Sequence, residues 1–322
     1  MRRAAISFAF ALAAGCGTTG DYAGGAANLP DWGGGTFAPI AADPAQSWNA
    51  PFVLQQASAD LADPDPIASG AAISIWVAVA RPGGFAIARA DAETLDGGFG
   101  ALAPALSADA AWEQGAVRGP SVVPGAPWLM LYAAGGAIGA ATSPDGAAWS
   151  KPPAPALTAD GGDEGASLGA PAAIVVGEKL RVYYAAAGAI WAAEAPLADF
   201  QAARAPAWTR LDGDPSTPAR DPIVRGVPFG GALDRPFARA EPTVTGAIRY
   251  TLGFSVALPD GTSGSGFAAS FDGISFAVQQ TPLLPLAPAS AAPALVRYGD
   301  RPLVFYVGRF GARDAIAVAA RP

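Results

Sequence analysis

Short runs rich in Val, Ile, Tyr, Phe and Trp recur from about residue 70 to the end of the chain. The first run of each recurring unit reads ISIWVAV (73–79), WLMLYAA (128–134), LRVYYAA (180–186), IRYTLGF (248–254) and LVFYVG (303–308). A second, alternating run follows each of them: FAIARA, AIGAATS, AIWAAEA, GFAASF and AIAVAA. Such runs, bounded by Gly, Pro and Asp, predict β-strands and not helices.

The runs belong to a unit of about fifty residues that is repeated along the chain. The stretch from Pro104 to Pro120 aligns without a gap with the stretch from Pro155 to Pro171. Each unit opens on a residue followed by proline, namely Asp65-Pro66, Gly119-Pro120, Ala170-Pro171, Glu241-Pro242 and Ala292-Pro293. Units of this length with four short strands are typical of propeller blades. The sequence therefore predicts an all-β fold, a five-bladed β-propeller of four-stranded antiparallel blades. We expect the chain between about Thr36 and Val53 to complete the last blade.

A Ser-x-Asp-Gly motif follows the second run in two of the units. It ends at Asp145-Gly146 in one and at Asp272-Gly273 in the other, and Trp149 and Phe276 stand three residues past the Gly. Asp and Gly tolerate the positive φ angles of tight turns. The motif therefore predicts a turn whose aromatic residue packs between neighbouring sheets, and not an active site.

The N-terminus carries the pattern of an export signal. Arg2 and Arg3 precede an apolar run from residue 4 to 14, which is too short to span a bilayer, and Cys16 follows it. The segment Leu-Ala-Ala-Gly-Cys resembles a bacterial lipobox, although a plain secretory peptide remains open. We expect a lipoprotein signal peptide over residues 1–15, a flexible Gly/Ala-rich tether over 16–44 and the propeller over 45–322. Because Gly17 follows the cysteine, the resemblance implies an outer-membrane lipoprotein anchored through Cys16.

Composition narrows the chemistry that the chain can perform. It contains no histidine, so it has no Ser-His-Asp triad, no Cys-His pair and no imidazole metal site. The net charge of -7 and the lack of a Lys/Arg cluster argue against nucleic acid as a partner. Catalysis would depend on Asp, Glu, Tyr, Lys or Arg. We expect a monomer without a cofactor or metal, held at a membrane only by its lipid.

The five-bladed pattern with S-x-D-G-x-x-W turns and x-Pro blade starts resembles the arabinanase, invertase and levansucrase superfamily of glycoside hydrolases. The resemblance implies three acids at the inner ends of the first three blades. The matching positions are Asp65, Gly119 and Ala170, and only the first is an acid. The prediction is therefore a glycoside-hydrolase-like propeller that binds a glycan or an envelope protein without cleaving sugar bonds.

Two alternatives stay open. Glu241 occupies the x-Pro position of the fourth unit, so Asp65 and Glu241 could face each other across the channel as the two carboxylates of a glycosidase. In the structural interpretation both acids only cap the starts of strands and are solvated. A third possibility is a structural envelope protein that displays loops to its neighbours.

Candidate ligand-binding residues come from two places. The insertion between the third and fourth units concentrates charge beside aromatic residues, namely Arg225, Phe229, Arg235, Phe237 and Arg239. Long loops over a propeller face often hold ligand contacts, although charges there can also serve solubility. Glu113 and Glu164 occupy identical repeat positions near the channel rim. Duplication of a structural residue explains this pair more economically than ligand binding does, and both interpretations stay open.

Overall fold

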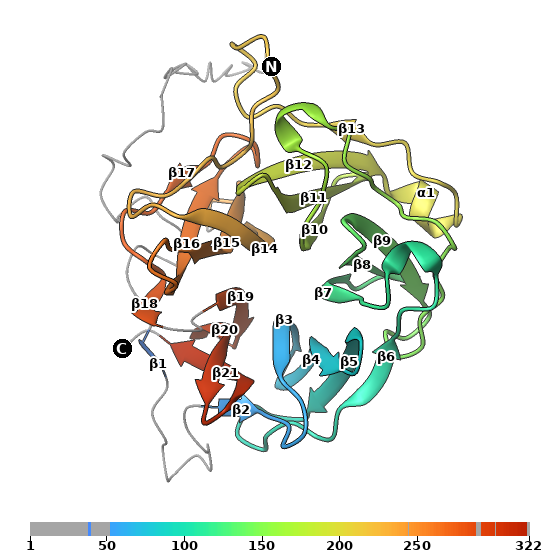
Figure 1. The fold of residues 1–322 in the computed structure, drawn as a ribbon, viewed down its shortest axis with the longest axis vertical. Helices are drawn as coiled ribbons and strands as arrows, with labels where there is room; N and C mark the ends of the chain where they lie inside the picture. The colour runs from blue at the N-terminus through green and yellow to red at the C-terminus, as the bar shows by residue number, and fades with distance from the viewer. Residues whose placement is uncertain (1–37, 40–51, 244, 288–290, 300, 321–322) are drawn as a thin grey trace, which may run out of the picture.

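The computed structural model describes residues 38–39, 52–243, 245–287, 291–299 and 301–320. These residues form five antiparallel sheets arranged as blades around a central axis (Figure 1). The predicted five-bladed β-propeller is therefore confirmed. The predicted signal segment 1–15 and Cys16 lie outside the described residues, as does most of the predicted tether 16–44.

In each blade the strand nearest the axis comes first among its three main strands (Figure 1). Blade one consists of β3 (Leu61–Ser69), β4 (Ala72–Arg81), β5 (Gly84–Ala92) and β6 (Ala103–Leu106). Blade two consists of β7 (Arg118–Val123), β8 (Trp128–Ala134) and β9 (Ala137–Ser143). Two isolated bridges, Thr142 to Ser150 and Ile138 to Leu157, take the place of its fourth strand.

The third and fourth blades follow the same order. Blade three consists of β10 (Pro171–Val176), β11 (Lys179–Ala186), β12 (Ala189–Pro196) and β13 (Thr209–Arg210). Blade four consists of β14 (Ala232–Pro242), β15 (Ile248–Ala257), β16 (Ser263–Ser270) and β17 (Ala277–Val278), and β18 (Leu284–Ala287) also pairs with β16. Helical structure in the described residues is limited to α1 (Leu197–Gln201) and the 3₁₀ turns η2 (Ala111–Glu113) and η3 (Gly162–Glu164). Within this part of the chain no helix is long and apolar enough to cross a membrane.

Blade five joins the two ends of the propeller. It consists of β19 (Ala291–Tyr298), β20 (Arg301–Phe310) and β21 (Arg313–Ala320), and the early strands β1 (Ala38–Pro39) and β2 (Phe52–Leu54) both pair with β21. The prediction that an N-terminal segment completes the last sheet is confirmed. Because this closure pairs the outer edge of β21, that edge is not left free for another chain.

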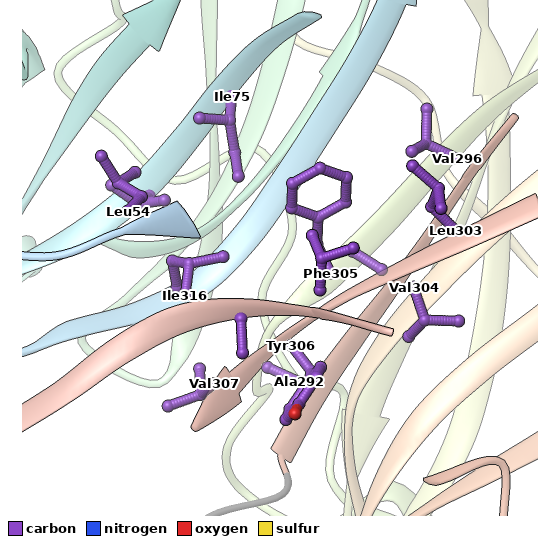
Figure 2. Close-up of a cluster of buried hydrophobic side chains, with 14 of the residues drawn as sticks. Leu54, Ile75, Ala292, Val296, Leu303, Val304, Phe305, Tyr306, Val307 and Ile316 are labelled. Carbon is purple, nitrogen blue, oxygen red and sulfur yellow. The ribbon is translucent and has the colours of Figure 1, made fainter. Parts of the chain in front are cut away.

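The hydrophobic core lies between neighbouring blades. Apolar side chains of facing sheets form four buried clusters, of which the largest joins blades four, five and one. Figure 2 shows part of it, where Leu54 and Ile75 approach Phe305 and Ile316. Alternation of apolar residues along each strand produces this arrangement, because successive side chains point to opposite faces of the sheet.

The Ser-x-Asp-Gly motifs form tight turns, as predicted. The backbone N–H of Gly146 donates to Ser143 Oγ at 2.9 Å, and the Ser143 hydroxyl donates to Asp145 Oδ1 at 3.0 Å. The same two hydrogen bonds recur in the turn that ends at Gly273. Both glycines have positive φ, 74° and 72°, which is the conformation that glycine adopts at no steric cost.

Each turn also binds the preceding blade. Trp76 of blade one donates to the carbonyl of Gly146, and Tyr183 of blade three donates to the carbonyl of Gly273. Phe276 packs edge-on against Tyr183 at 5.7 Å, and Trp149 packs against the cluster that contains Trp76. The motif therefore fastens one blade to its neighbour, which confirms the predicted packing of its aromatic residue.

Candidate functional site

A kink in the innermost strands identifies the equivalent position of each blade. The strand register shifts at this point in blades one, two, four and five. In each of these the residue before a proline has positive φ: Asp63 (50°), Gly119 (58°), Arg235 (47°) and Ala292 (51°). In blade three, Ala170 precedes the corresponding Pro171.

The x-Pro alignment made from the sequence was therefore wrong in two blades. The structural equivalents are Asp63-Pro64 in blade one and Arg235-Pro236 in blade four, not Asp65-Pro66 and Glu241-Pro242. Both blades contain two x-Pro pairs close together. A repeat period alone does not choose between them, because the bulge that fixes the register depends on backbone geometry.

These kinks meet at a pocket on the propeller axis. All five blades contribute to it, each through a proline and its neighbours: Asp63, Pro64, Asp65, Gly119, Pro120, Ser121, Ala170, Pro171, Ala172, Arg235, Pro236, Phe237, Ala292 and Pro293. The hollow has a volume of about 320 Å³, open solvent included. Most of this volume is open solvent, and the space that the centre of a water molecule can reach is about 20 Å³, so the pocket itself is small.

Three residues from three blades form an ion-pair group at this pocket, which we call the axial cluster: Asp63, Arg118 and Arg235. The Asp63 carboxylate accepts from Arg118 Nε at 3.0 Å, from Arg118 Nη2 at 3.4 Å and from the backbone N–H of Gly119 at 3.2 Å. Arg235 Nε lies 3.1 Å from Asp63 Oδ1. Since blades one and four are not adjacent, this pair reaches across the axis.

Electrostatics keep Asp63 ionised. Burial alone would raise the pKa of Asp63, but the charges of Arg235 and Arg118 and the hydrogen bonds to the carboxylate outweigh burial and hold that pKa below its ordinary value. The carboxylate is engaged on both oxygens and its side chain is only 4% exposed. A group bound in this way is a poor base, because protonation would cost it two ion pairs.

Asp65 lies on the pocket wall and is also covered. Its Oδ2 accepts from the backbone N–H of Val122 at 2.6 Å, and the residue is 2% exposed. Burial raises the pKa of Asp65 to about 6, against the opposing charge of Arg239 and the bond from Val122. Asp63 and Asp65 are the two acids among the described residues that line the pocket.

The structure does not bring the predicted pair Asp65 and Glu241 into one pocket. Glu241 is six residues beyond Arg235 on β14, which places it about 20 Å further along the strand at roughly 3.3 Å per residue. It is not among the described residues that line the pocket, and its side chain is 31% exposed near Arg297, at 4.0 Å. The sequence had paired these acids because of the misplaced x-Pro alignment.

The residues predicted from the insertion divide into two groups. Arg235 and Phe237 line the pocket. Arg239 continues the same strand, where it is half-buried, lies over the Phe237 ring at 4.3 Å and donates to the Pro66 carbonyl at 2.7 Å. This arrangement closes the channel wall beside Asp65.

The other two insertion residues lie away from the pocket. Arg225 has a side chain that is 61% exposed and pairs closely with Asp221. Phe229 is half-buried and packs against the core between blades three and four. Neither is among the described residues that line the pocket.

Glu113 and Glu164 occupy matching buried positions. Glu113 accepts from Lys151 Nζ at 2.6 Å, from the Tyr132 hydroxyl at 2.8 Å and from two backbone N–H groups of its own turn. Glu164 accepts from the Tyr184 hydroxyl in the same manner and pairs with Arg210 at 3.1 Å. Both glutamates are fully buried, so these contacts make each of them an anchor of a turn between blades.

Three residues near the axis were missed by sequence reasoning as candidates: Asp63, Arg118 and Asp234. The repeated Asp-Pro-Asp-Pro of residues 63–66 was a signal, because Asp tolerates positive φ better than most residues. Asp234 is half-exposed, and its Oδ1 accepts the backbone N–H of Arg235 at 2.8 Å. A Cβ atom placed on Gly169 of blade three would lie 3.3 Å from Asp234 Oδ1, so an acid from blade four occupies space beside blade three.

Residues that could hold a metal ion are not gathered in the described part of the chain. No group of three or more Asp, Glu or Cys side chains is arranged for a metal ion there. The pocket offers an apolar ring of prolines with charged groups from blades one and four, and Arg118 of blade two pairs with one of these groups.

Comparison with known proteins extends this description at the level of fold. No protein-family model and no curated protein matches the sequence. Among solved structures, a glycosyl hydrolase from Bacteroides ovatus superposes with a TM-score of 0.64 at 14% identity, covering 91% of this chain and 96% of that one. The α-L-arabinofuranosidase of Podospora anserina, solved with cellotriose, has a TM-score of 0.59 at 13% identity, with 85% and 97% covered. An exo-1,5-α-L-arabinanase from a bovine ruminal metagenomic library has a TM-score of 0.58 at 13% identity, with 82% and 94% covered. The chain therefore has the fold of arabinanase-type glycoside hydrolases.

Proposed function

We propose that the protein binds one residue of a glycan in the axial pocket and does not hydrolyse it. The observation that carries this proposal is the axial cluster. Glycoside hydrolysis needs two carboxylates that can exchange protons or attack the sugar. Here Asp63 is held by two arginines, and the described lining residues from blades two, three and five are Gly, Ala, Pro and Ser.

The fold and the lining of the pocket support glycan binding. The pocket sits on the axis of a fold shared with glycoside hydrolases, and all five blades contribute residues to it. The rings of five prolines offer C–H surface to a sugar ring, while Arg235 offers donors for its hydroxyl groups.

A glycan array probed with the purified full-length chain tests the proposal, followed by calorimetry and a reducing-sugar assay on each glycan bound. We expect binding without release of reducing sugar. The variant R235Q should lose binding, whereas R225Q should keep it because Arg225 lies outside the pocket. Absence of binding across neutral and acidic glycans would overturn the proposal.

A specific observation favours glycosidase activity as a second candidate. Asp63 Oδ1 lies 3.1 Å and Asp234 Oδ2 lies 3.6 Å from the same Arg235 nitrogen, so these oxygens are at most about 7 Å apart. Retaining enzymes hold their carboxylates roughly 5–5.5 Å apart and inverting enzymes roughly 6.5–9.5 Å apart. Release of sugar that is abolished by both D63N and D234N would select this candidate over binding alone.

We also propose that the chain is exported and anchored by lipid on Cys16, which rests on the sequence of residues 2–16. Metabolic labelling with a radioactive fatty acid in a bacterial host tests this. The wild-type chain should be labelled and fractionate with membranes, and C16S should not. Equal labelling of both chains would refute lipid attachment at Cys16.

A further inference from the structure

In the axial cluster, the arginines are more accessible than the carboxylates beside them. The side chain of Asp63 is 4% exposed and Asp65 is 2% exposed, whereas the side chains of Arg118 and Arg235 are 34% and 28% exposed. Arg235 lines the pocket, and Arg118 pairs with the lining residue Asp63. Among the charged residues that line the pocket, Arg235 is therefore the most accessible to a ligand.

Both arginines keep donors that the protein does not use. Arg118 bonds Asp63 through Nε and Nη2. Arg235 approaches Asp63 through Nε, but this buried nitrogen has no hydrogen-bond partner, and its Nη atoms donate to none of the described residues. Because Arg235 Nε is buried against Asp63, the Nη groups are the donors of Arg235 that a ligand could engage.

The backbone at Arg235 sets the direction of its side chain. Its φ of 47° belongs to the bulge that also gives Asp63, Gly119 and Ala292 a positive φ in their blades. Here the bulge in β14 directs Arg235 toward the axis.

We propose that the glycan residue bound in the pocket is an acidic sugar whose carboxylate lies against Arg118 and Arg235. A guanidinium group is planar and presents paired donors that match the two oxygens of a carboxylate. Hexuronic acids and sialic acids share this chemistry. The inference rests on the proposed glycan binding and assigns the chemical class of the ligand.

Asp234 is the exposed acid closest to this site and sets a limit on the affinity. Its Oδ2 lies 3.6 Å from Arg235 Nε and its side chain is 50% exposed. A bound carboxylate would be repelled by it, since like charges at short range disfavour each other. Removal of this charge in D234N should therefore strengthen binding of an acidic sugar and leave binding of a neutral sugar unchanged.

Matched saccharides test the inference by calorimetry on the full-length chain. The probes are trigalacturonate against its carboxyl-reduced galactose trisaccharide, and sialyllactose against lactose. We expect at least one acidic probe to bind about tenfold or more tightly than its neutral partner, as charge-assisted hydrogen bonds imply. This preference should disappear in R235Q and R118Q and persist in R225Q, with circular dichroism and melting temperature as checks of folding.

The possible outcomes distinguish failure of the acidic-sugar assignment from failure of the proposed glycan binding. Equal affinity for acidic and neutral probes, or a preference that survives both R235Q and R118Q, overturns the acidic-sugar assignment and leaves glycan binding in place. If neither these probes nor any glycan of the array binds, both the inference and the proposed function are wrong. Which acidic probe binds distinguishes a hexuronic acid from a sialic acid.

Discussion

Replacing Asp63 with Asn tests whether the axial cluster holds three blades together. Asn has nearly the same shape and tolerates the left-handed φ of 50° at this position, so the substitution removes the charge and little else. Arg118 and Arg235 would then face each other without their common counter-ion. We expect D63N to be less stable than the wild type at neutral pH.

The size of the effect follows from burial. Removing one partner of a buried ion pair costs roughly 3–5 kcal/mol. Since the two arginines are about one-third exposed, water can solvate them in part, and the lower end, about 3 kcal/mol, is the expected loss. For a domain of this size that corresponds to a fall in melting temperature of about 6–12 °C.

The lowered pKa of Asp63 also predicts how the stability difference between the two chains changes with pH. Because the folded-state pKa of Asp63 is lowered, its contribution is fully present above the unfolded pKa of about 3.9 and is lost as the pH falls through the folded value. Urea unfolding of the two chains between pH 7 and pH 3 should therefore show a difference that shrinks at acid pH. D314N is the matched control, because Asp314 pairs with Arg309 at the surface and contributes at most about 1 kcal/mol. If D63N is as stable as the wild type at pH 7, the axial cluster does not hold the blades.

Three further substitutions examine the contacts between blades. G146A should lower the free energy of unfolding in urea more than G261A does. Both glycines have positive φ, but the new Cβ at position 146 would lie 3.0 Å from the Trp128 ring, whereas the space around Gly261 is open. Equal losses of stability would mean that backbone strain alone matters. E113Q should lower the free energy of unfolding by about 2–4 kcal/mol, because it leaves the buried Lys151 without its main counter-charge. A loss below about 1 kcal/mol would show that Asp109, which also pairs with Lys151, compensates. Y183F should lower the free energy of unfolding by about 1 kcal/mol, because it removes the hydrogen bond to the Gly273 carbonyl in the turn of the next blade. An unchanged midpoint of urea unfolding would show that this hydrogen bond does not hold the two blades together.

The fold could be predicted because its signals are local and repeated. Nine of the ten predicted strand runs lie within or coincide with strands of the structure, and the tenth, GFAASF, extends one residue past the end of β16 at Ser270. The Ser-x-Asp-Gly turns and the closure by β1 and β2 were also correct. Each signal is a pattern of side chains along a few residues, and repetition in five blades compensates for noise in any one of them. The missing fourth strand of blade two does not alter the architecture.

The site could be predicted only in part, because it depends on strand register and on contacts between distant segments. Arg235 and Phe237 were predicted from the concentration of charge and aromatic residues in the insertion, and Asp65 from its place before a proline; all three line the pocket. Asp63 and Arg118 were missed, since their pairing joins blades one and two at a bulge that no repeat period reveals. Glu241 was predicted in place of Arg235 because the repeat spacing gives the distance along the chain, whereas the position of a residue relative to the pocket depends on the strand register.

The same geometry that joins the blades also limits the chemistry at the axis. A carboxylate can stabilise two arginines or act on a substrate, but the first role lowers its pKa and covers its oxygens, which removes it from the second. The arginines, in contrast, gain from being held, because a fixed and partly exposed guanidinium group loses little entropy when it binds a ligand. This arrangement is the reason for proposing recognition of a sugar, and not cleavage of its bonds, on a fold that the chain shares with solved glycosidases.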